Sequence, residues 1–207
     1  MKKNRKRGLG FLIALFIMTM CFGTIAQAQT GLVDAGGTYF FFDAKGAKVR
    51  NQWETVLVDG QKFKFYFGKN GAAYKARRLY EDAYNVKLFK IGKKQYGFDN
   101  LSHLAAPGNY VNDRYQFVAI GKNGVYNASK TKKLRNTIKP GKKGKNIYNL
   151  VVKTLGKPVS VDRSPSCSPW NEKDSFTDVL LVYPHYEVQL IQNDRTKEYL
   201  LDNYFPR

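Results

Sequence analysis

Aromatic residues recur just ahead of short turns, and their flat rings are the groups in this chain whose type and spacing suit ligand binding. One frame, YFFFDAKG, runs from Tyr39 to Gly46, and a second, FYFGKNG, runs from Phe65 to Gly71. Looser copies cover 96–102 and 117–124. Such rings can stack on sugars or hold a quaternary ammonium by cation–π attraction. The repeat therefore favours a binding module over a catalytic pocket.

Residue types that support catalysis are sparse and scattered. The two histidines, His103 and His185, fall in different parts of the chain, and no His, Cys, Asp and Glu cluster has the spacing of a metal site. Cys167 lies in a proline-rich segment and not at a helix N-terminus, so it lacks the setting that is typical of an activated thiol. We therefore expect no catalytic residues, no metal and no cofactor. A carboxylate pair for glycoside hydrolysis would have to come from the acids Glu172, Asp174, Asp178 and Glu187, which are more typical of a solvated surface.

The elements that carry the aromatic frames are expected to be β-hairpins. Aromatic and β-branched runs over 37–127 alternate with Gly, Asn and Asp, and Asn70-Gly71 and Asn123-Gly124 are strong turn signals. The turn positions Gly46, Gly71, Ser102 and Gly124 are unevenly spaced, and Ser102 in place of glycine suggests a different turn. One hairpin cannot bury a core, so the hairpins must stack. The sequence predicts a mainly β fold: a stacked β-hairpin solenoid over 29–127, followed by a small α+β unit.

The first frame resembles a known repeat family. Gly37, Tyr39, Phe41, Phe42, Asp43, Gly46, Val49 and Trp53 match the cell-wall-binding repeat of Gram-positive surface proteins, the choline-binding and glucan-binding type. This resemblance, which weakens over the later copies, implies a left-handed β-solenoid whose aromatic residues bind choline or glucan. Since Trp53 is the only Trp at the expected place, a general wall or glycan contact is favoured over a choline cage. The expected ligand contacts are Tyr39, Trp53 and Tyr74.

A basic stretch separates the repeats from the last part of the chain. We expect 128–145 to be a linker, because Pro140, Gly141 and Gly144 interrupt any helix there. Its cations could attract anionic wall polymers or headgroups, and the candidate polyanion-binding residues are Lys130, Lys132, Lys133, Arg135, Lys142, Lys143 and Lys145. A nucleic-acid partner is not expected.

The final unit, 146–207, is predicted to hold one helix and three strands. Apolar residues at helical spacing predict a helix over 146–155, which Gly156 and Pro158 end. A loop should follow over 159–175, then strands over 177–183, 186–192 and 198–201. The stretch 144–158 also resembles the helix of small α/β lipoproteins, which implies a possible protein partner. The alternative function is a small secreted enzyme or protein inhibitor seated in 128–207.

The first 28 residues have the pattern of a secretory signal peptide. Lys and Arg precede an apolar run, and Ala26-Gln27-Ala28 has the spacing of a signal-peptidase site. Cleavage would leave 30 basic against 16 acidic residues, a formal charge of +14, and Cys167 as the only cysteine. No intramolecular disulfide is then possible. A retained anchor stays open as an alternative. We expect a secreted, wall-associated protein that meets wall glycan or teichoic acid, without a transmembrane span after cleavage.

Overall fold

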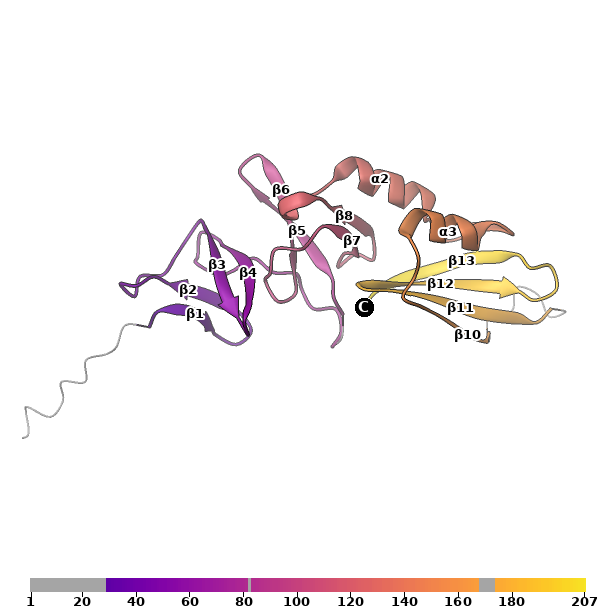
Figure 1. Cartoon of the computed structure of the whole chain (residues 1–207), viewed down its shortest axis with the longest axis horizontal. Coiled ribbons are helices and arrows are strands. Elements are labelled where there is room, and N and C mark those ends of the chain that lie inside the picture. The colour runs from indigo at the N-terminus through magenta and orange to yellow at the C-terminus, as the bar shows by residue number, and fades with distance from the viewer. Residues whose placement is uncertain (1–28, 82, 168–173) are drawn as a thin grey trace, which may run out of the picture.

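The computed structural model describes residues 29–81, 83–167 and 174–207, so the predicted signal peptide and Glu172 lie outside the described residues. The fold is mainly β, as predicted, and the hairpins form a row that leads to the C-terminal unit (Figure 1). Four two-stranded antiparallel sheets come first. They pair β1 (Gly31–Asp34) with β2 (Tyr39–Phe42), β3 (Gln52–Val58) with β4 (Gln61–Phe67), β5 (Val86–Ile91) with β6 (Lys94–Asp99), and β7 (Gly108–Val111) with β8 (Phe117–Ile120).

Five turns share one hydrogen-bonded geometry. In the first, the backbone N–H of Asp43 donates to Ala47 O, and the N–H of Gly46 donates to Asp43 O. The same pair of bonds begins at Gly68, Asp99 and Asn112, while Gly121 N donates to Val125 O in the last turn, which holds the short helix η1 (Lys122–Gly124). The fourth position has positive φ in all five, at Gly46, Gly71, Ser102, Tyr115 and Gly124.

Two of these turns correct the sequence prediction. Ser102 has φ 70°, so the third copy turns like the others and not differently. Its turn is held by Asp99, whose Oδ1 accepts hydrogen bonds from the backbone N–H groups of Leu101 and His103. The turn at 112–116 was not recognised, because Tyr115 stands where a glycine was sought. Asn112 holds it in the same way, accepting from Arg114 N and Gln116 N.

Backbone hydrogen bonds join each hairpin to the next. Ala73 N donates to Tyr39 O, Leu104 N donates to Lys64 O, and Tyr126 N donates to Gln95 O. Turn glycines support this stacking because they leave room for a neighbour. A Cβ on Gly124 would meet Leu104 Cδ1 at 2.3 Å, and one on Gly71 would meet Lys48 Cδ at 2.6 Å.

The linker expected over 128–145 is replaced by a helix over most of its first half. Helix α2 (Ala128–Thr137) begins at Asn127, whose side chain accepts from Lys130 N. Thr131 and Leu134 are buried on its inner face. The prediction was wrong because Pro140 and the glycines come after the helix, and lysine is itself a good helix former.

The C-terminal unit adds a second helix and a five-stranded antiparallel sheet. Helix α3 (Ile147–Leu155) confirms the predicted one. Strands β11 (Phe176–Tyr183), β12 (Tyr186–Asn193) and β13 (Tyr199–Pro206) confirm the three predicted, although β13 is longer because its end pairs along β12. The loop expected over 159–175 instead contains β10 (Ser160–Pro165), which pairs along β11. The short β9 (Lys143–Gly144) completes the order β10-β11-β12-β13-β9.

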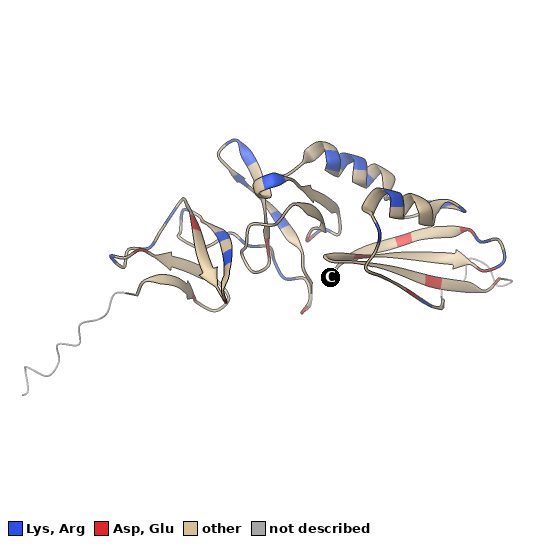
Figure 2. Cartoon of the chain, in the orientation of Figure 1, with Lys and Arg blue, Asp and Glu red and all other residues tan. Residues whose placement is uncertain are grey.

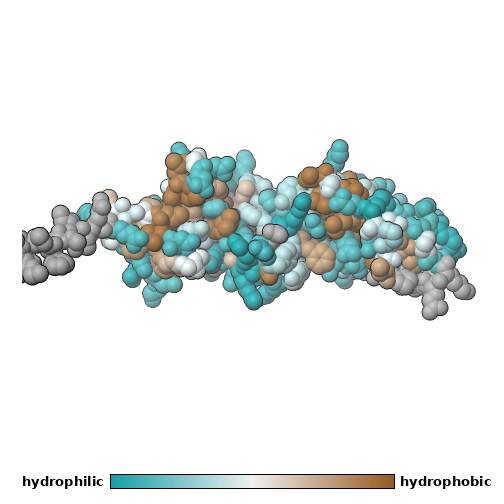
Figure 3. Space-filling model, turned by 90° about the horizontal axis from the view of Figure 1, so that it is seen from below, coloured by the Kyte–Doolittle hydropathy of each residue, from teal (hydrophilic) through white to brown (hydrophobic). Residues whose placement is uncertain are grey.

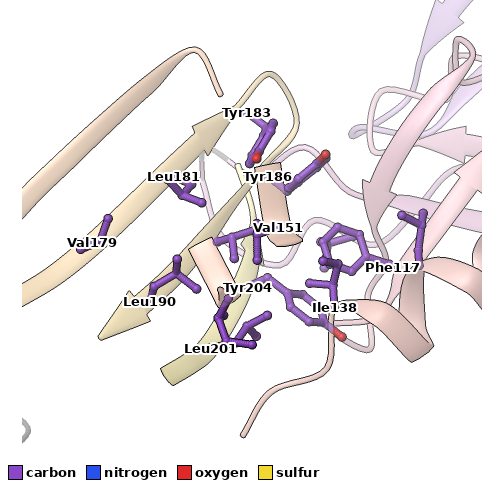
Figure 4. Packing of buried hydrophobic residues seen from close by; sticks show 14 of the residues in the cluster. Phe117, Ile138, Val151, Val179, Leu181, Tyr183, Tyr186, Leu190, Leu201 and Tyr204 are labelled. Atoms are coloured by element: carbon purple, nitrogen blue, oxygen red, sulfur yellow. The ribbon is translucent and has the colours of Figure 1, made fainter. Parts of the chain in front are cut away.

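The largest core joins the last hairpin to this unit. Phe117 of β8, Val151 of α3 and Tyr204 of β13 lie in one cluster and point toward one another (Figure 4). The ring centroids of Phe117 and Tyr204 are 4.4 Å apart. The hairpin β7–β8 therefore packs as part of the C-terminal core as well as of the repeats. In the part of the chain that the structure describes, we find no helix with the length and apolar character that a membrane crossing requires.

Candidate functional site

Strand alternation in the hairpin β3–β4 decides which rings are core and which lie nearer the surface. Phe63, Phe65 and Phe67 point to one face, where they pack in a cluster with Leu32, Tyr39, Phe41, Val49, Ala73, Val56 and Val58. Tyr66 and Lys64 point to the other face, together with Trp53, which is paired directly with Tyr66. This second face meets the hairpin β5–β6.

An aromatic cluster lies between these two hairpins. Trp53 is 5.1 Å from Tyr66 and 5.1 Å from Tyr96, ring centroid to centroid, and both rings are steeply inclined to it, at 65° and 68°. Tyr74 stacks on Phe89 at 4.4 Å and lies 5.1 Å from Tyr66. The aromatic cluster consists of Trp53, Tyr66, Tyr74, Phe89, Tyr96 and Phe98. Phe98 is its buried floor, and the other five are partly exposed.

Two of the three predicted ligand contacts belong to this cluster. Trp53 and Tyr74 both lie against Tyr66 and Phe98, which bring them together. Tyr39 lies elsewhere: its ring packs edge-on to Phe65 at 6.1 Å, and it lines a separate cavity.

Sequence reasoning did not identify Tyr66, Phe89 or Tyr96 as site residues. A signal for Tyr66 was present, because it is out of phase with Phe63, Phe65 and Phe67 along one strand. The other two could not be found this way, since they reach the cluster from the next hairpin.

Lysine side chains already lie over several of the exposed rings. Lys64 Nζ is 4.9 Å from the centroid of Trp53, Lys48 Nζ is 4.1 Å from that of Phe40, and Lys87 Nζ is 5.5 Å from that of Phe89. Proteins contain about one such contact in 70–80 residues. Here all three contacts lie between Phe40 and Phe89. Among the described residues, none of the three lysines forms an ion pair. The ring faces thus carry unneutralised positive charge.

The predicted polyanion-binding residues divide into two groups. Lys130, Lys132 and Lys133 are exposed on α2, and Lys143 and Lys145 are exposed after it. Lys and Arg gather on α2 and on the hairpin β5–β6, while several acids lie on the C-terminal sheet (Figure 2). Arg135 and Lys142 are turned toward the protein. Arg135 Nε donates to Phe117 O, and Lys142 Nζ donates to two carbonyls at the end of α2. Their charges help to hold the fold.

The candidate nucleophile and bases do not come together. His185 lies in the turn between β11 and β12, where its ring stacks on both Tyr84 and Tyr110, with centroid distances of 4.8 and 4.7 Å. Cys167 is exposed beyond the opposite end of β11, where Pro165 pairs with Thr177. Six residues of strand separate Thr177 from Tyr183, about 20 Å. His103 lies in the repeats, stacked on Phe63. Cys167 and either histidine therefore form no nucleophile–base pair.

Burial shifts the pKa values of His185 and of the two tyrosines on which it stacks, Tyr84 and Tyr110. It lowers the pKa of His185, an effect that the nearby Asp99 partly opposes. It also raises the pKa of Tyr110 to about 12, and together with the hydrogen bond from Tyr84 Oη to Asp99 it raises the pKa of Tyr84. No group of three or more His, Cys, Asp or Glu in residues 29–81, 83–167 and 174–207 could hold a metal ion.

Comparisons with known proteins give partial structural matches. No family model matches the chain, and neither does any curated protein. Among solved structures, choline-binding protein F of Streptococcus pneumoniae matches at 17% identity over 48% of this chain and 28% of its own, with a TM-score of 0.34. The endolysin of phage Cp-1, complexed with choline, matches at 15% identity over 48% and 31%, with a TM-score of 0.28.

A third match is the choline-binding domain of CbpL from Streptococcus pneumoniae. It is 17% identical over 48% of this chain and 78% of the domain, with a TM-score of 0.13. The chain spans less than a third of the length of the first of these structures. These three structures are a choline-binding protein, an endolysin complexed with choline and a choline-binding domain, and a solved structure of alternansucrase also matches 49% of this chain.

Proposed function

We propose that this chain is a secreted, non-enzymatic protein that attaches to bacterial wall glycan through the partly exposed rings of the aromatic cluster. The observation that carries the proposal is the contact of Trp53 with Tyr66 and Tyr96, three partly exposed rings from two successive hairpins. Aromatic faces bind the C–H surfaces of sugar rings by apolar burial. The face of the molecule shown in Figure 3 is largely hydrophilic, with apolar areas over the N-terminal hairpins and over the C-terminal unit.

A sugar suits this site better than choline does. A quaternary ammonium would need the ring faces that Lys64 and Lys87 already occupy, and it would be repelled by their charge. A sugar ring can stack beside an ammonium and accept hydrogen bonds from it. The exposed lysines of α2 add a non-specific attraction to anionic wall polymers such as teichoic acid, and salt should weaken that part.

Sedimentation with purified Gram-positive walls tests the proposal. The whole chain from residue 29 is used, because Phe117 in the repeats shares a core with the C-terminal unit. We expect it to sediment with walls at low salt and to retain part of that binding at high salt. Trp53→Ala should reduce the retained part at least fivefold. Tyr115→Ala is a matched control, since Tyr115 is an exposed ring in the repeats outside the cluster. Absence of sedimentation at both salt concentrations would refute the proposal.

A further inference from the structure

A cavity of about 410 Å³ lies where the first hairpin, the segment after the second turn and the third turn meet. Its volume is within the range of small-ligand sites, about 300–1,000 Å³. It is separate from the aromatic cluster. The residues that line it are Asp34, Gly37, Tyr39, Lys75, Ala76, Arg77, Arg78, Asn100 and Leu101.

The cations of this cavity are not neutralised from within. Arg77 and Arg78 are exposed, and neither forms an ion pair with a described residue. Lys75 Nζ donates to the carbonyl of Gly37, which holds the ammonium at the cavity wall. The lining carboxylate, Asp34, is engaged by the backbone N–H of Gly37 at 2.6 Å. Three positive groups therefore face one carboxylate that already has a partner.

The remaining lining is suited to the ring of a sugar. Tyr39 is partly exposed, and Leu101 is 40% exposed although it is a large apolar residue. Asn100 Nδ2 is bound to Ala83 O, whereas its buried Oδ1 has no hydrogen-bond partner. The lining of the cavity thus includes one aromatic residue, one exposed apolar residue and two arginines. Guanidinium groups bind carboxylates and phosphates through paired N–H donors.

We propose that this cavity binds an acidic sugar unit, one whose carboxylate or phosphate pairs with Arg77 and Arg78 while its ring lies against Tyr39. The proposal rests on the glycan-binding function above and names the class of glycan. It assigns recognition to a site distinct from the aromatic cluster, so that the two can fail separately. Attachment through rings alone would accept neutral glycans, whereas this cavity selects charged ones.

Titration calorimetry on the whole chain from residue 29 tests it with three oligomers. Trigalacturonate carries carboxylates, maltotriose phosphorylated on its 6-hydroxyl groups carries phosphates, and maltotriose itself is neutral. We expect at least one acidic oligomer to bind ten times more tightly than maltotriose, and the better of the two identifies the anionic group. Arg77→Gln with Arg78→Gln should weaken that binding at least tenfold. The matched control is Arg50→Gln with Arg114→Gln, two exposed arginines of the repeats outside the cavity.

Each outcome decides the question. Equal binding of maltotriose, no binding of either acidic oligomer, or equal losses in the two double variants would overturn the proposal, the last because it would show diffuse attraction to net charge. An unchanged melting temperature confirms that the surface variants are folded. Wall sedimentation is read separately. A chain that binds walls but no acidic oligomer refutes this inference alone, and one that binds the oligomer but no walls refutes wall attachment alone.

Discussion

The side chain of Lys48 lies directly across Gly71, so that residues of two successive turns are in contact. A Cβ on Gly71 would come within 2.6 Å of Lys48 Cδ and within 3.2 Å of the carbonyl oxygen of Val49. Lys48 also places its ammonium over Phe40. The turn glycine therefore has two functions, to adopt positive φ and to leave space for the preceding turn.

The two functions of Gly71 can be separated by substitution. In Gly71→Ala the new Cβ is strained by a φ of 81° and also crowds Lys48. In Gly60→Ala it is strained by a similar φ of 79°, but no atom lies within 4 Å of it. We expect Gly60→Ala to lower the free energy of unfolding by about 1 kcal/mol and Gly71→Ala to lower it by about 2–4 kcal/mol, since crowding adds to strain. Urea unfolding measures both. Equal losses would mean that Lys48 moves aside freely.

Ser102 is a position where glycine should stabilise the chain. It has φ 70°, and its hydroxyl is buried with no hydrogen-bond partner. Ser102→Gly relieves the strain and removes the unpaired group, so we expect a gain of about 1 kcal/mol in unfolding free energy. Ser102→Ala is the control, because it removes only the hydroxyl and should gain less. A loss of stability in Ser102→Gly would contradict this reasoning.

Lys64 is expected to exclude quaternary ammonium ligands from Trp53. Lys64→Gln removes the cation over that ring, so the variant should bind choline more tightly, about threefold or more given the modest energy of one exposed cation–π contact. Lys62→Gln is the matched control, since Lys62 is on the same face of β4 and contacts no ring. Choline binding is followed by tryptophan fluorescence. An equal rise in both variants would show that only net charge matters.

His185 should make stability depend on pH. Burial lowers its pKa in the folded state, so between that value and about 6.5, its ordinary value, the unfolded chain binds more protons. Stability is therefore expected to fall as the pH falls through about 6.5. His185→Phe keeps a flat ring against Tyr84 and Tyr110 without titrating, and it should reduce this slope in unfolding measurements from pH 7.5 to 5.5. An unchanged slope in this variant would contradict the assignment to His185.

The helix α2 and the strand β10 show why parts of the fold were not predicted. Pro140 and two glycines suggested an interrupted linker, yet the helix ends before them and is held by Thr131, whose Oγ1 accepts from Ala119 N of β8. The strand β10 is exposed along its whole length, with Pro165 at its end, so it has no apolar alternation to reveal it. It forms a strand because it pairs antiparallel with β11 along its whole length.

The sequence by itself determined the mainly β fold and most of the positive-φ turns, although the turns at Gly46, Gly71 and Gly124 follow hairpins and do not join their two strands. Those features depend on neighbouring residues: positive φ at Gly46, Gly71 and Gly124, and alternation along Phe63, Phe65 and Phe67. It also identified Trp53 and Tyr74 as residues to examine. Only the tertiary structure decided that Trp53 contacts Tyr96 and that Tyr39, Arg77 and Arg78 line one cavity. Those groups are brought together by the stacking of separate hairpins, and no local pattern encodes which rings and cations will meet.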